Sequence, residues 1–347
     1  MNITETGIAL SERLKRIITD FQNKSDSQNQ KFEAVLHQAE IANKWFTADM
    51  SVHALQGIIS MLQPASLALL PAEVKVVNPK NIGIICAGNI PLVAFHDLWC
   101  VLYSGHRAVL KLSGDDTVLM TFICELLCEV NPDLKQSITI VERLKNADAI
   151  IATGSNNAFR YFDYYFGKYP HIFRKNRNSV ALLTGNETVT QMHALADDLF
   201  MYFGLGCRSI SKVFVPEGYT FDFFFESIQQ YGHDLLQHNK YCNNYEYHKA
   251  LYLLELIPFL TNNFLIIKEA EAWSTPVSVL HYQYYNDAHK LLAHLFDNKE
   301  LLQCIAVADV NEWPHASLKL HPLGTLQKPL INDYADGINT LDFLNNL

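Results

Sequence analysis

The sequence has no long run of apolar residues. The longest candidate, residues 251–267, is interrupted by Glu255, by Pro258 and by the asparagines at 262 and 263. A membrane-spanning helix needs about 20 mostly apolar residues, so we expect no membrane span. Residues 1–25 are polar and mixed in charge, without the apolar core of a signal peptide, so we expect no secretory leader.

Paired cysteines are missing as well. The chain has 7 cysteines, an odd number, and none forms a CxxC pair. In a chain of 347 residues, this pattern favours reduced thiols and a cytoplasmic location over a disulfide framework. No cluster of histidine, cysteine and aspartate has the spacing of zinc ligands, so we expect no metal. Cys124 and Cys128 lie in an apolar helical stretch and are better explained as core thiols.

Positive charge is sparse. Lysine and arginine number 27 against 36 aspartates and glutamates, which gives a net charge of -9. The basic residues form no long run, so the charge balance gives no support for a nucleic-acid partner. The chain is 49% hydrophobic and 18% charged. Such a composition is typical of globular proteins, and the length favours two domains.

Two series of short strands can be read from the apolar pattern. Residues 8–70 have helical spacing, and we expect Pro64 and Pro71 to end that region. Apolar runs that indicate strands follow at 82–86, 108–112, 138–141 and 149–152, then at 179–183, 212–215, 264–267, 277–282 and 305–307. Short continuous runs between helices are typical of parallel strands covered on both faces. The first series therefore predicts a doubly wound nucleotide-binding domain.

The pattern divides the chain into three parts. We expect residues 1–177 to form the cofactor domain with its helical N-terminal region. We expect residues 178–318 to form a second α/β domain, which is catalytic, and residues 319–347 to form a tail that packs at the domain junction. The glycine-rich fingerprint of standard dinucleotide-binding domains is absent, since only Ala87-Gly88-Asn89 follows the first strand. A standard Rossmann dehydrogenase is therefore not the best match.

Cys207 is the candidate nucleophile. It follows two glycines, Gly204 and Gly206, and precedes a predicted strand, so a loop can present it to an interdomain cleft. A reactive thiol needs partial exposure and local positive potential, which Arg208, Lys212 and the loop amides can supply. A cysteine beside glycines is also often a small buried residue, and the local sequence leaves both interpretations open.

Several segments occur in an order that resembles a known family. They are residues 87–92, Gly105, Lys111, residues 153–155 and Cys207. In this series the chain resembles the aldehyde dehydrogenase superfamily, and more closely the acyl-CoA reductases of the LuxC type. Residues 43–47, 321–324 and 334–337 are also similar to that family, and the resemblance extends over residues 35–345. It implies an aldehyde-dehydrogenase-like α/β fold.

The resemblance implies chemistry for two residues. Cys207 matches the nucleophile that attacks the thioester carbonyl of a fatty acyl-CoA. The resulting enzyme thioester is then reduced by a nicotinamide cofactor to a fatty aldehyde. Asn89 matches the side-chain amide of the oxyanion hole. Taken from its own sequence alone, Asn89 is better explained as a residue that shapes the turn before Pro91.

The resemblance also implies how the cofactor is bound. Lys111 would bind the adenosine ribose, with Ser113 beside it. Gly154 and Ser155 would open a helix whose N-terminus faces the pyrophosphate. The alternatives are a solvated lysine at a strand end and an ordinary N-cap serine.

Cofactor preference depends on the residue at position 114. Many NAD-preferring relatives have an acidic ribose clamp there, whereas this chain has Gly114. The absence of a carboxylate favours NADPH, with NADH as the alternative. Asp115 and Asp116 lie next to this position and weaken the inference.

Two departures from the superfamily concern glutamates. Hydrolytic relatives have a glutamate that activates water. This chain has no carboxylate at the corresponding place, which falls in the basic stretch 173–177. Without that base, acyl transfer to and from CoA is favoured over hydrolysis. Arg174, Lys175 and Arg177 could meet CoA phosphates or form a solvated basic loop. Glu271 lies one place away from the glutamate that bonds the nicotinamide ribose, and an exposed helix residue explains it equally well.

Other aromatic and imidazole groups have simpler explanations. His96 and His106 could donate a proton, but helix-surface or satisfied core histidines are favoured. The aromatic residues of 219–225 and 241–252 could line an acyl channel, but helix core is the simpler assignment.

The reading as a whole predicts an NADPH-dependent acyl-CoA reductase. An acyl-CoA is its substrate, acyl-transferring or acyl-activating proteins are further partners, and we expect a homo-oligomer. An aldehyde dehydrogenase for a small aldehyde, or a non-catalytic subunit of an acyl-transfer complex, are the alternatives.

Overall fold

The computed structural model describes residues 1–23, 27–72, 76, 78–154, 156–313 and 318–347. The chain divides into two compact units, which are described separately. Unit 1 comprises Met1–Asn176 and Pro329–Leu347, and unit 2 comprises Arg177–Lys328. The segment predicted as a tail, 319–347, is therefore shared between the units, with its last part built into unit 1.

Unit 1 is built on a five-stranded sheet in the order β3-β2-β1-β4-β5, and every pairing in it is parallel. Its strands are β1 (Asn81–Ile85), β2 (Arg107–Lys111), β3 (Ile138–Ile140), β4 (Ala149–Thr153) and β5 (His171–Arg174). Ile82 and Ile84 in the central strand are at most 1% exposed, as expected for a strand covered on both faces. Full burial of such a side chain contributes about 1.5–3 kcal/mol.

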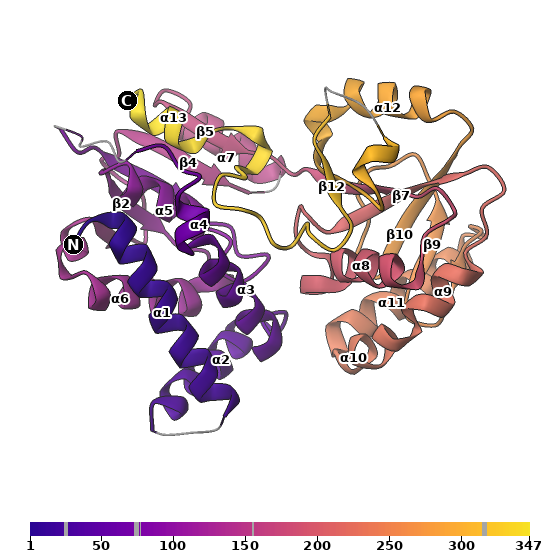
Figure 1. Cartoon of the computed structure of the whole chain (residues 1–347), viewed down its shortest axis with the longest axis horizontal. Helices are drawn as coiled ribbons and strands as arrows, with labels where there is room; N and C mark the ends of the chain where they lie inside the picture. The colour runs from indigo at the N-terminus through magenta and orange to yellow at the C-terminus, as the bar shows by residue number, and fades with distance from the viewer. Residues whose placement is uncertain (24–26, 73–75, 77, 155, 314–317) are drawn as a thin grey trace. The chain divides into compact units, whose positions relative to one another are not determined.

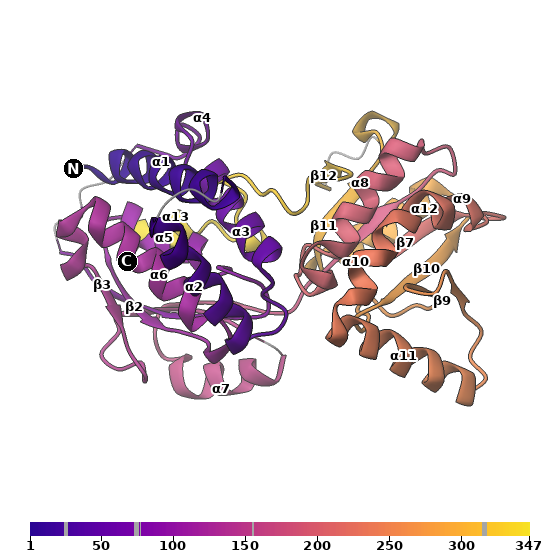
Figure 2. The same ribbon diagram turned by 90° about the horizontal axis from the view of Figure 1, so that it is seen from below.

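Helices cover both faces of this sheet. They are α5 (Phe95–Tyr103), α6 (Thr117–Val130) and α7 (Asn156–Phe166). Figure 2 shows α7 on the opposite side of the strands from α5 and α6. The arrangement follows from right-handed crossovers that leave the central strands in opposite directions. The predicted doubly wound architecture is thus confirmed.

Four N-terminal helices precede the sheet, and the first two pack against α6. They are α1 (Ile3–Gln22), α2 (Ser27–Ala42), α3 (Ala48–Met61) and α4 (Pro64–Leu67). Asn2 and Glu5 form a capping box that begins α1, and Leu10 and Leu14 on its inner face are fully buried. Pro64 was expected to end the helical region, but it begins the short helix α4. Proline is tolerated there because the first turn of a helix needs no backbone N–H from it.

Unit 2 contains a seven-stranded sheet in the order β12-β11-β6-β7-β10-β9-β8. Its strands are β6 (Asn178–Leu182), β7 (Ile210–Pro216), β8 (Leu260–Thr261), β9 (Ile266–Glu269), β10 (Val279–Tyr285), β11 (Leu302–Val307) and β12 (Leu320–Pro322). Only β8 is antiparallel to its neighbour. Its helices are α8 (Val189–Phe200), α9 (Asp222–Ile228), α10 (Gly232–Gln237), α11 (Asn239–Leu254) and α12 (Ala288–Asp297). Figure 1 shows α12 on one side of this sheet and α8, α10 and α11 on the other.

The C-terminal segment completes unit 1. Helix α13 (Thr340–Asn345) buries Leu341 and Leu344 and packs against α5. Of the helices in the described ranges, none combines the length and apolar character that a membrane span requires.

Candidate functional site

The carboxyl ends of three strands meet at one edge of the unit 1 sheet. In the register, Ile85 of β1 lies beside Lys111 of β2 on one side and Ala152 of β4 on the other. The chain leaves β1 and β4 toward opposite faces, so this edge is a topological switch point. Ligands of open α/β sheets bind at such points. The residues that follow β1, β2 and β4 include Asn89, Ser113 and Gly154.

The turn that carries Asn89 is braced at both ends. Asn43 donates a hydrogen bond from Nδ2 to the carbonyl of Gly88, at 3.4 Å. Asp116 accepts the backbone N–H of Leu92 on Oδ2, at 2.7 Å. Leu92 has a φ of 59°, a conformation that a leucine adopts only when its surroundings hold it. Asn89 itself is exposed, and these two hydrogen bonds fix the backbone of its turn.

Asp116 has an unusual environment for a carboxyl group. It is 2% exposed, and Oδ1 has no hydrogen-bond partner among the described residues. Burial raises the pKa of Asp116 to about 8, although the hydrogen bond from Leu92 acts in the opposite direction. At neutral pH this side chain is therefore mostly protonated and adds little negative charge to the cofactor edge.

The predicted cofactor residues lie around the same edge. Lys111 is half-buried at the end of β2. Ser113 caps the short helix η1 (Gly114–Asp116) by accepting the N–H of Asp115, at 3.3 Å. A Cβ at Gly88 would lie 2.5 Å from Ser113 Oγ, so glycine allows the two turns to touch. Gly154 similarly allows close packing at the start of α7, where a Cβ would lie 3.0 Å from Phe162. Ser155 lies outside the described residues.

Cys207 of unit 2 lies on a strained turn between α8 and β7. The turn begins with η3 (Met201–Gly204), in which Tyr202, Phe203 and Gly204 have φ values of 54°, 56° and 77°. Each non-glycine residue in this left-handed region costs about 1–3 kcal/mol, so tertiary contacts must hold it. Both aromatic side chains are buried, and the ring of Phe203 lies 4.2 Å from that of His238. The buried rings hold the turn in place, while Cys207 at the end of the turn is exposed.

The thiol of Cys207 differs in exposure from the other cysteines. All 7 lie within the described residues. Cys207 is exposed, whereas Cys86, Cys100, Cys124 and Cys304 are buried and the remaining two, Cys128 and Cys242, are half-buried. Burial raises the pKa of Cys86 to about 12, which keeps that thiol protonated and unreactive. Exposure is a condition for nucleophilic attack, and Cys207 meets it.

Two hydrogen bonds fix the backbone of the Cys207 turn. Ser179 of β6 donates from Oγ to the carbonyl of Cys207, at 2.8 Å. The N–H of Ser209 bonds to the carbonyl of Gly206, at 3.0 Å. The nucleophile candidate is thus held by its main chain, while its side chain faces solvent.

The basic residues near Cys207 are already engaged. Arg208 donates from a terminal nitrogen to Cys304 Sγ, at 3.5 Å. Lys212 is fully buried, and its ammonium group bonds to the carbonyl of Glu271 and to Gln283. Both cationic groups therefore bind partners other than the Cys207 thiol. Their contribution of positive potential to Cys207 stays a prediction.

The segment that contains the expected family motif at 321–324 packs near the Cys207 turn. Asp198 at the end of α8 accepts the N–H groups of Gly324 and Leu326, at 2.7 and 3.0 Å. Gln327 donates to Ser209 Oγ, at 3.4 Å. This segment therefore supports unit 2 beside the nucleophile candidate.

Arg174 corrects the expectation of a solvated or CoA-binding basic loop. It lies on β5, is 4% exposed, and forms an ion pair with Asp97 at 2.6 Å. Its guanidinium also donates to the carbonyl of Ala335 and to Thr340 Oγ1. All its partners lie within unit 1, so Arg174 is a structural residue. Lys175 lies over the ring of Phe159, at 4.4 Å.

The two histidines considered as proton donors bind main-chain atoms. His106 is buried; Nδ1 accepts the N–H of Lys80 at 3.1 Å, and Nε2 lies 3.1 Å from the carbonyl of Leu344. Nδ1 accepts a hydrogen bond, so it carries no proton. The carbonyl of Leu344 cannot donate a hydrogen bond, so the proton of the neutral ring must lie on Nε2. His96 Nε2 lies 2.7 Å from the carbonyl of Ile331. The favoured explanation as satisfied core or helix-surface histidines is confirmed.

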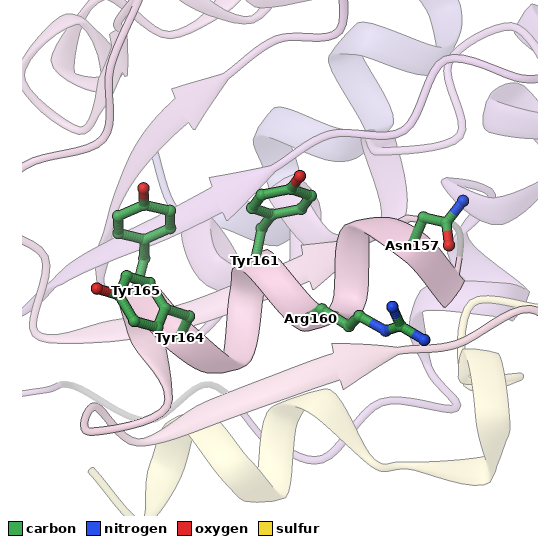
Figure 3. A pocket seen from close by; sticks show the side chains of 5 residues that line it. All are labelled: Asn157, Arg160, Tyr161, Tyr164 and Tyr165. Atoms are coloured by element: carbon green, nitrogen blue, oxygen red, sulfur yellow. The ribbon is translucent and has the colours of Figure 1, made fainter.

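The outer face of α7 forms a surface hollow of about 540 Å³ (Figure 3). It is lined by Asn157, Arg160, Tyr161, Tyr164 and Tyr165. The residues that line it include no thiol, and no imidazole or carboxylate that could activate a tyrosine there, so Cys207 stays the better candidate nucleophile.

Comparison with protein families finds a match for the segment that contains the candidate residues of both units. Residues 73–228 match the family model for acyl-CoA reductase (LuxC), and this range includes Asn89, Lys111, Gly154 and Cys207. Over these residues the chain is similar to the acyl-CoA reductases of the LuxC family. No curated protein sequence matches the chain.

Solved structures show the fold of the chain. Aldehyde dehydrogenase 21 from Physcomitrella patens, in complex with succinate, has a TM-score of 0.65 at 11% identity, covering 100% of this chain and 84% of its own. Indole-3-acetaldehyde dehydrogenase AldA from P. syringae has a TM-score of 0.62 at 11% identity, covering 93% and 77%. A Mycobacterium tuberculosis aldehyde dehydrogenase complexed with NAD+ has a TM-score of 0.61 at 14% identity, covering 90% and 75%. The predicted aldehyde-dehydrogenase-like fold is confirmed.

Three supporting residues were not predicted from the sequence. Asn43 and Asp116 brace the Asn89 turn, and Ser179 braces Cys207. Asn43 belongs to the motif 43–47 that resembles the LuxC family, which was the one available signal. The other two contacts join residues far apart in sequence, and residue spacing gives no sign of them.

Proposed function

We propose that this protein is an NADPH-dependent reductase of fatty acyl-CoA of the LuxC type, with Cys207 as the acyl acceptor. The observation that carries the proposal is the exposure of Cys207 on a turn whose backbone is held by Ser179 and by buried rings. A thiol held in this way can attack without a prior rearrangement of the chain.

The chemistry proceeds through a thioester on Cys207. The Cys207 sulfur forms a bond to the thioester carbonyl carbon, and the CoA thiolate leaves with the electron pair of the broken bond. When bound, the nicotinamide supplies a hydride to the carbonyl carbon of this enzyme thioester. The resulting thiohemiacetal oxyanion re-forms the carbonyl as its carbon–sulfur bond breaks, which releases the aldehyde and leaves the electron pair on the Cys207 thiolate. The whole cycle therefore returns the sulfur of Cys207 to its starting state.

Asn89 is the proposed donor to the developing oxyanion. Its side chain is exposed while its turn is fixed by Asn43 and Asp116, and the Cys207 N–H is the second donor in this proposal. One preorganised donor of this kind lowers the barrier by about 3–4 kcal/mol.

The residues at the carboxyl edge of the unit 1 sheet fit a nicotinamide dinucleotide. Lys111 offers a cationic donor, and the N-terminus of α7 begins just beyond Gly154, where backbone N–H groups favour a pyrophosphate. Gly114 leaves open space, because a Cβ there would meet nothing within 4 Å. Together with the raised pKa of Asp116, this supports NADPH, whose 2′-phosphate is repelled by a charged carboxylate. The exposed Asp115 next to Gly114 acts in the opposite direction.

The absence of a water-activating glutamate supports reduction over hydrolysis. Phe173 occupies the corresponding place in β5 and packs against the rings of Phe159 and Phe162. An aromatic side chain cannot take a proton from water, so the thioester on Cys207 survives long enough to be reduced.

The test is acyl labelling of the intact protein. A radiolabelled fatty acyl-CoA should leave label on the wild-type chain and none on Cys207→Ala. Cys242→Ala is the matched control, because Cys242 is half-buried and should not affect labelling. Adding NADPH should release the label as aldehyde.

Three results would contradict the proposal. Absence of label on the wild type would favour a non-catalytic partner subunit. Label that persists in Cys207→Ala would exclude this nucleophile. Label that NADPH does not discharge would exclude reductase activity.

A further inference from the structure

Ser179 is a buried serine near the start of β6. Its side chain is fully buried, and its hydroxyl donates to the carbonyl of Cys207 at 2.8 Å. The two residues lie 28 positions apart in the chain. This hydrogen bond therefore connects the core of the unit 2 sheet with the turn that carries the exposed thiol.

The direction of the Ser179 side chain follows from the alternation of side chains along β6. Val180 and Leu182 belong to a core cluster that includes leucines of α12. Successive side chains of a strand point to opposite faces of the sheet. Ser179 therefore points to the other face, where Figure 1 shows α8. The Cys207 turn follows directly after α8, so the hydroxyl lies on the face from which this turn begins.

The pairing of β6 is irregular on both sides of Ser179. Its register with β7 shifts between Ser179 and Val180, and its register with β11 shifts just before Cys304, the partner of Ser179. Each neighbouring strand thus has one extra residue beside Ser179. Bulges of this kind change where a side chain points, and they are over-represented next to active sites. This irregularity is a second observation, independent of the hydrogen bond, that indicates a role for Ser179 beyond filling the core.

The bond from Ser179 fixes one of the two peptide groups that flank Cys207. The other peptide group is fixed by the N–H of Ser209, which donates to the carbonyl of Gly206 at 3.0 Å. A trans peptide group is planar, so the N–H of Cys207 points away from the carbonyl of Gly206. Because both carbonyls are bound, little freedom remains in the two backbone dihedral angles of Cys207. Ser179 and the turn together therefore set the direction of the Cys207 N–H.

The turn depends on this contact because glycines precede the nucleophile. Gly204 has a φ of 77°, and Gly206 directly precedes Cys207. Glycine gives the backbone more conformational freedom than any other residue. Without the bond to β6, the turn would therefore sample several orientations, and the bond from Ser179 favours one of them.

We propose that Ser179 is a positioning residue for acyl transfer, whose hydroxyl holds the carbonyl of Cys207 so that the Cys207 N–H points at the oxyanion formed from the thioester. This inference rests on the proposed function and uses contacts within unit 2 alone. As the bond between sulfur and the carbonyl carbon forms, the π electron pair of the carbonyl moves to its oxygen. A donor stabilises this charge best when it is already directed at it. Ser179 itself touches no reacting atom.

Two electrophiles separate this role from a general structural one. A fatty acyl-CoA reacts with Cys207 through an oxyanion, whereas iodoacetamide is attacked at a saturated carbon, loses iodide and forms no oxyanion. Ser179→Ala should slow acyl labelling of the intact protein about 10-fold, with the half-saturating concentration of acyl-CoA unchanged. Alkylation of Cys207 by iodoacetamide, located by peptide mass spectrometry, should keep the wild-type rate. Ser179→Thr keeps the hydroxyl and should recover most of the acylation rate.

Ser227→Ala is the matched control. Ser227 is also buried, and it donates to the carbonyl of Phe223 at the same distance of 2.8 Å, but it lies in α9. Acylation and alkylation should both keep the wild-type rate in this variant. Four results would each overturn the inference: unchanged acylation in Ser179→Ala, equal slowing of acylation and alkylation in that variant, a similar effect in Ser227→Ala, or no recovery in Ser179→Thr.

A folding defect is handled by a second variant. If thermal unfolding shows that Ser179→Ala does not fold, Ser179→Cys fills a similar space with a weaker hydrogen-bond donor. It should slow acylation about 3-fold and leave the alkylation of Cys207 unchanged. A wild-type rate of acylation in Ser179→Cys would then overturn the inference. Failure of the proposed function is distinct, because the wild-type chain would then take no acyl label while Cys207 still reacts with iodoacetamide.

Discussion

At the scale of single residues, Asp116 is expected to make stability depend on pH. Its folded pKa is raised to about 8 by burial, whereas an unfolded aspartate has a pKa of about 3.9. Between these values the unfolded chain loses a proton that the folded chain keeps, so stability falls as pH rises through this window. Across the whole window the loss of stability is on the order of a few kcal/mol.

Asp116→Asn should flatten the fall in unfolding free energy with pH, measured by urea unfolding from pH 5 to 8, since asparagine can still accept the Leu92 N–H. Asp115→Asn, at an exposed position, should keep the wild-type slope, and a slope that Asp116→Asn leaves intact would contradict this account.

At the scale of elements, the connection from β2 to α6 is expected to set cofactor preference. Gly114 begins η1, and a Cβ there would meet nothing within 4 Å, so an aspartate fits without distortion. A carboxylate near a 2′-phosphate is repelled by about 1–4 kcal/mol. Gly114→Asp should therefore lower the ratio of kcat/KM for NADPH to that for NADH about 10-fold. Steady-state kinetics with both cofactors measure this ratio, and Gly114→Ala should leave it unchanged. A similar shift in the alanine variant would show that shape, and not charge, sets the preference.

The same scale shows why the sequence predicts some elements and not others. The strands β1, β2, β4 and β7 each contain a short apolar run, so their burial is visible in the residues themselves. Strand β5 was missed because His171 and Arg174 make it resemble a basic loop, while the partner that neutralises Arg174 is Asp97 on α5. The turn at Tyr202 and Phe203 was missed because aromatic residues do not favour left-handed backbone. In each case a distant contact, absent from local sequence, decides the structure.

At the scale of the whole molecule, a substitution that destabilises unit 1 should leave the stability of unit 2 unchanged. Unit 1 combines residues up to Asn176 with the C-terminal segment from Pro329, and Arg174 binds Asp97 as well as Ala335 and Thr340 of that segment. Arg174→Met leaves the Asp97 charge buried and unpaired, which should destabilise unit 1 by about 3–5 kcal/mol.

Hydrogen exchange followed by mass spectrometry measures this loss for each unit. Peptides from β1, β4 and α13 should exchange faster by about 100-fold or more through global opening of unit 1, while peptides from β7 and β10 should keep their protection. Arg177→Met is the control. Arg177 also binds the carbonyls of Lys299 and Leu302, but its partner Glu300 has a side chain that is 79% exposed. Its loss therefore leaves no buried charge unpaired and should cost less than the loss of Arg174. Equal loss of protection in both units would mean that they unfold together. Exchange confined to unit 1 would mean that each sheet forms a cooperative core of its own, with the cofactor edge and the nucleophile turn stabilised independently.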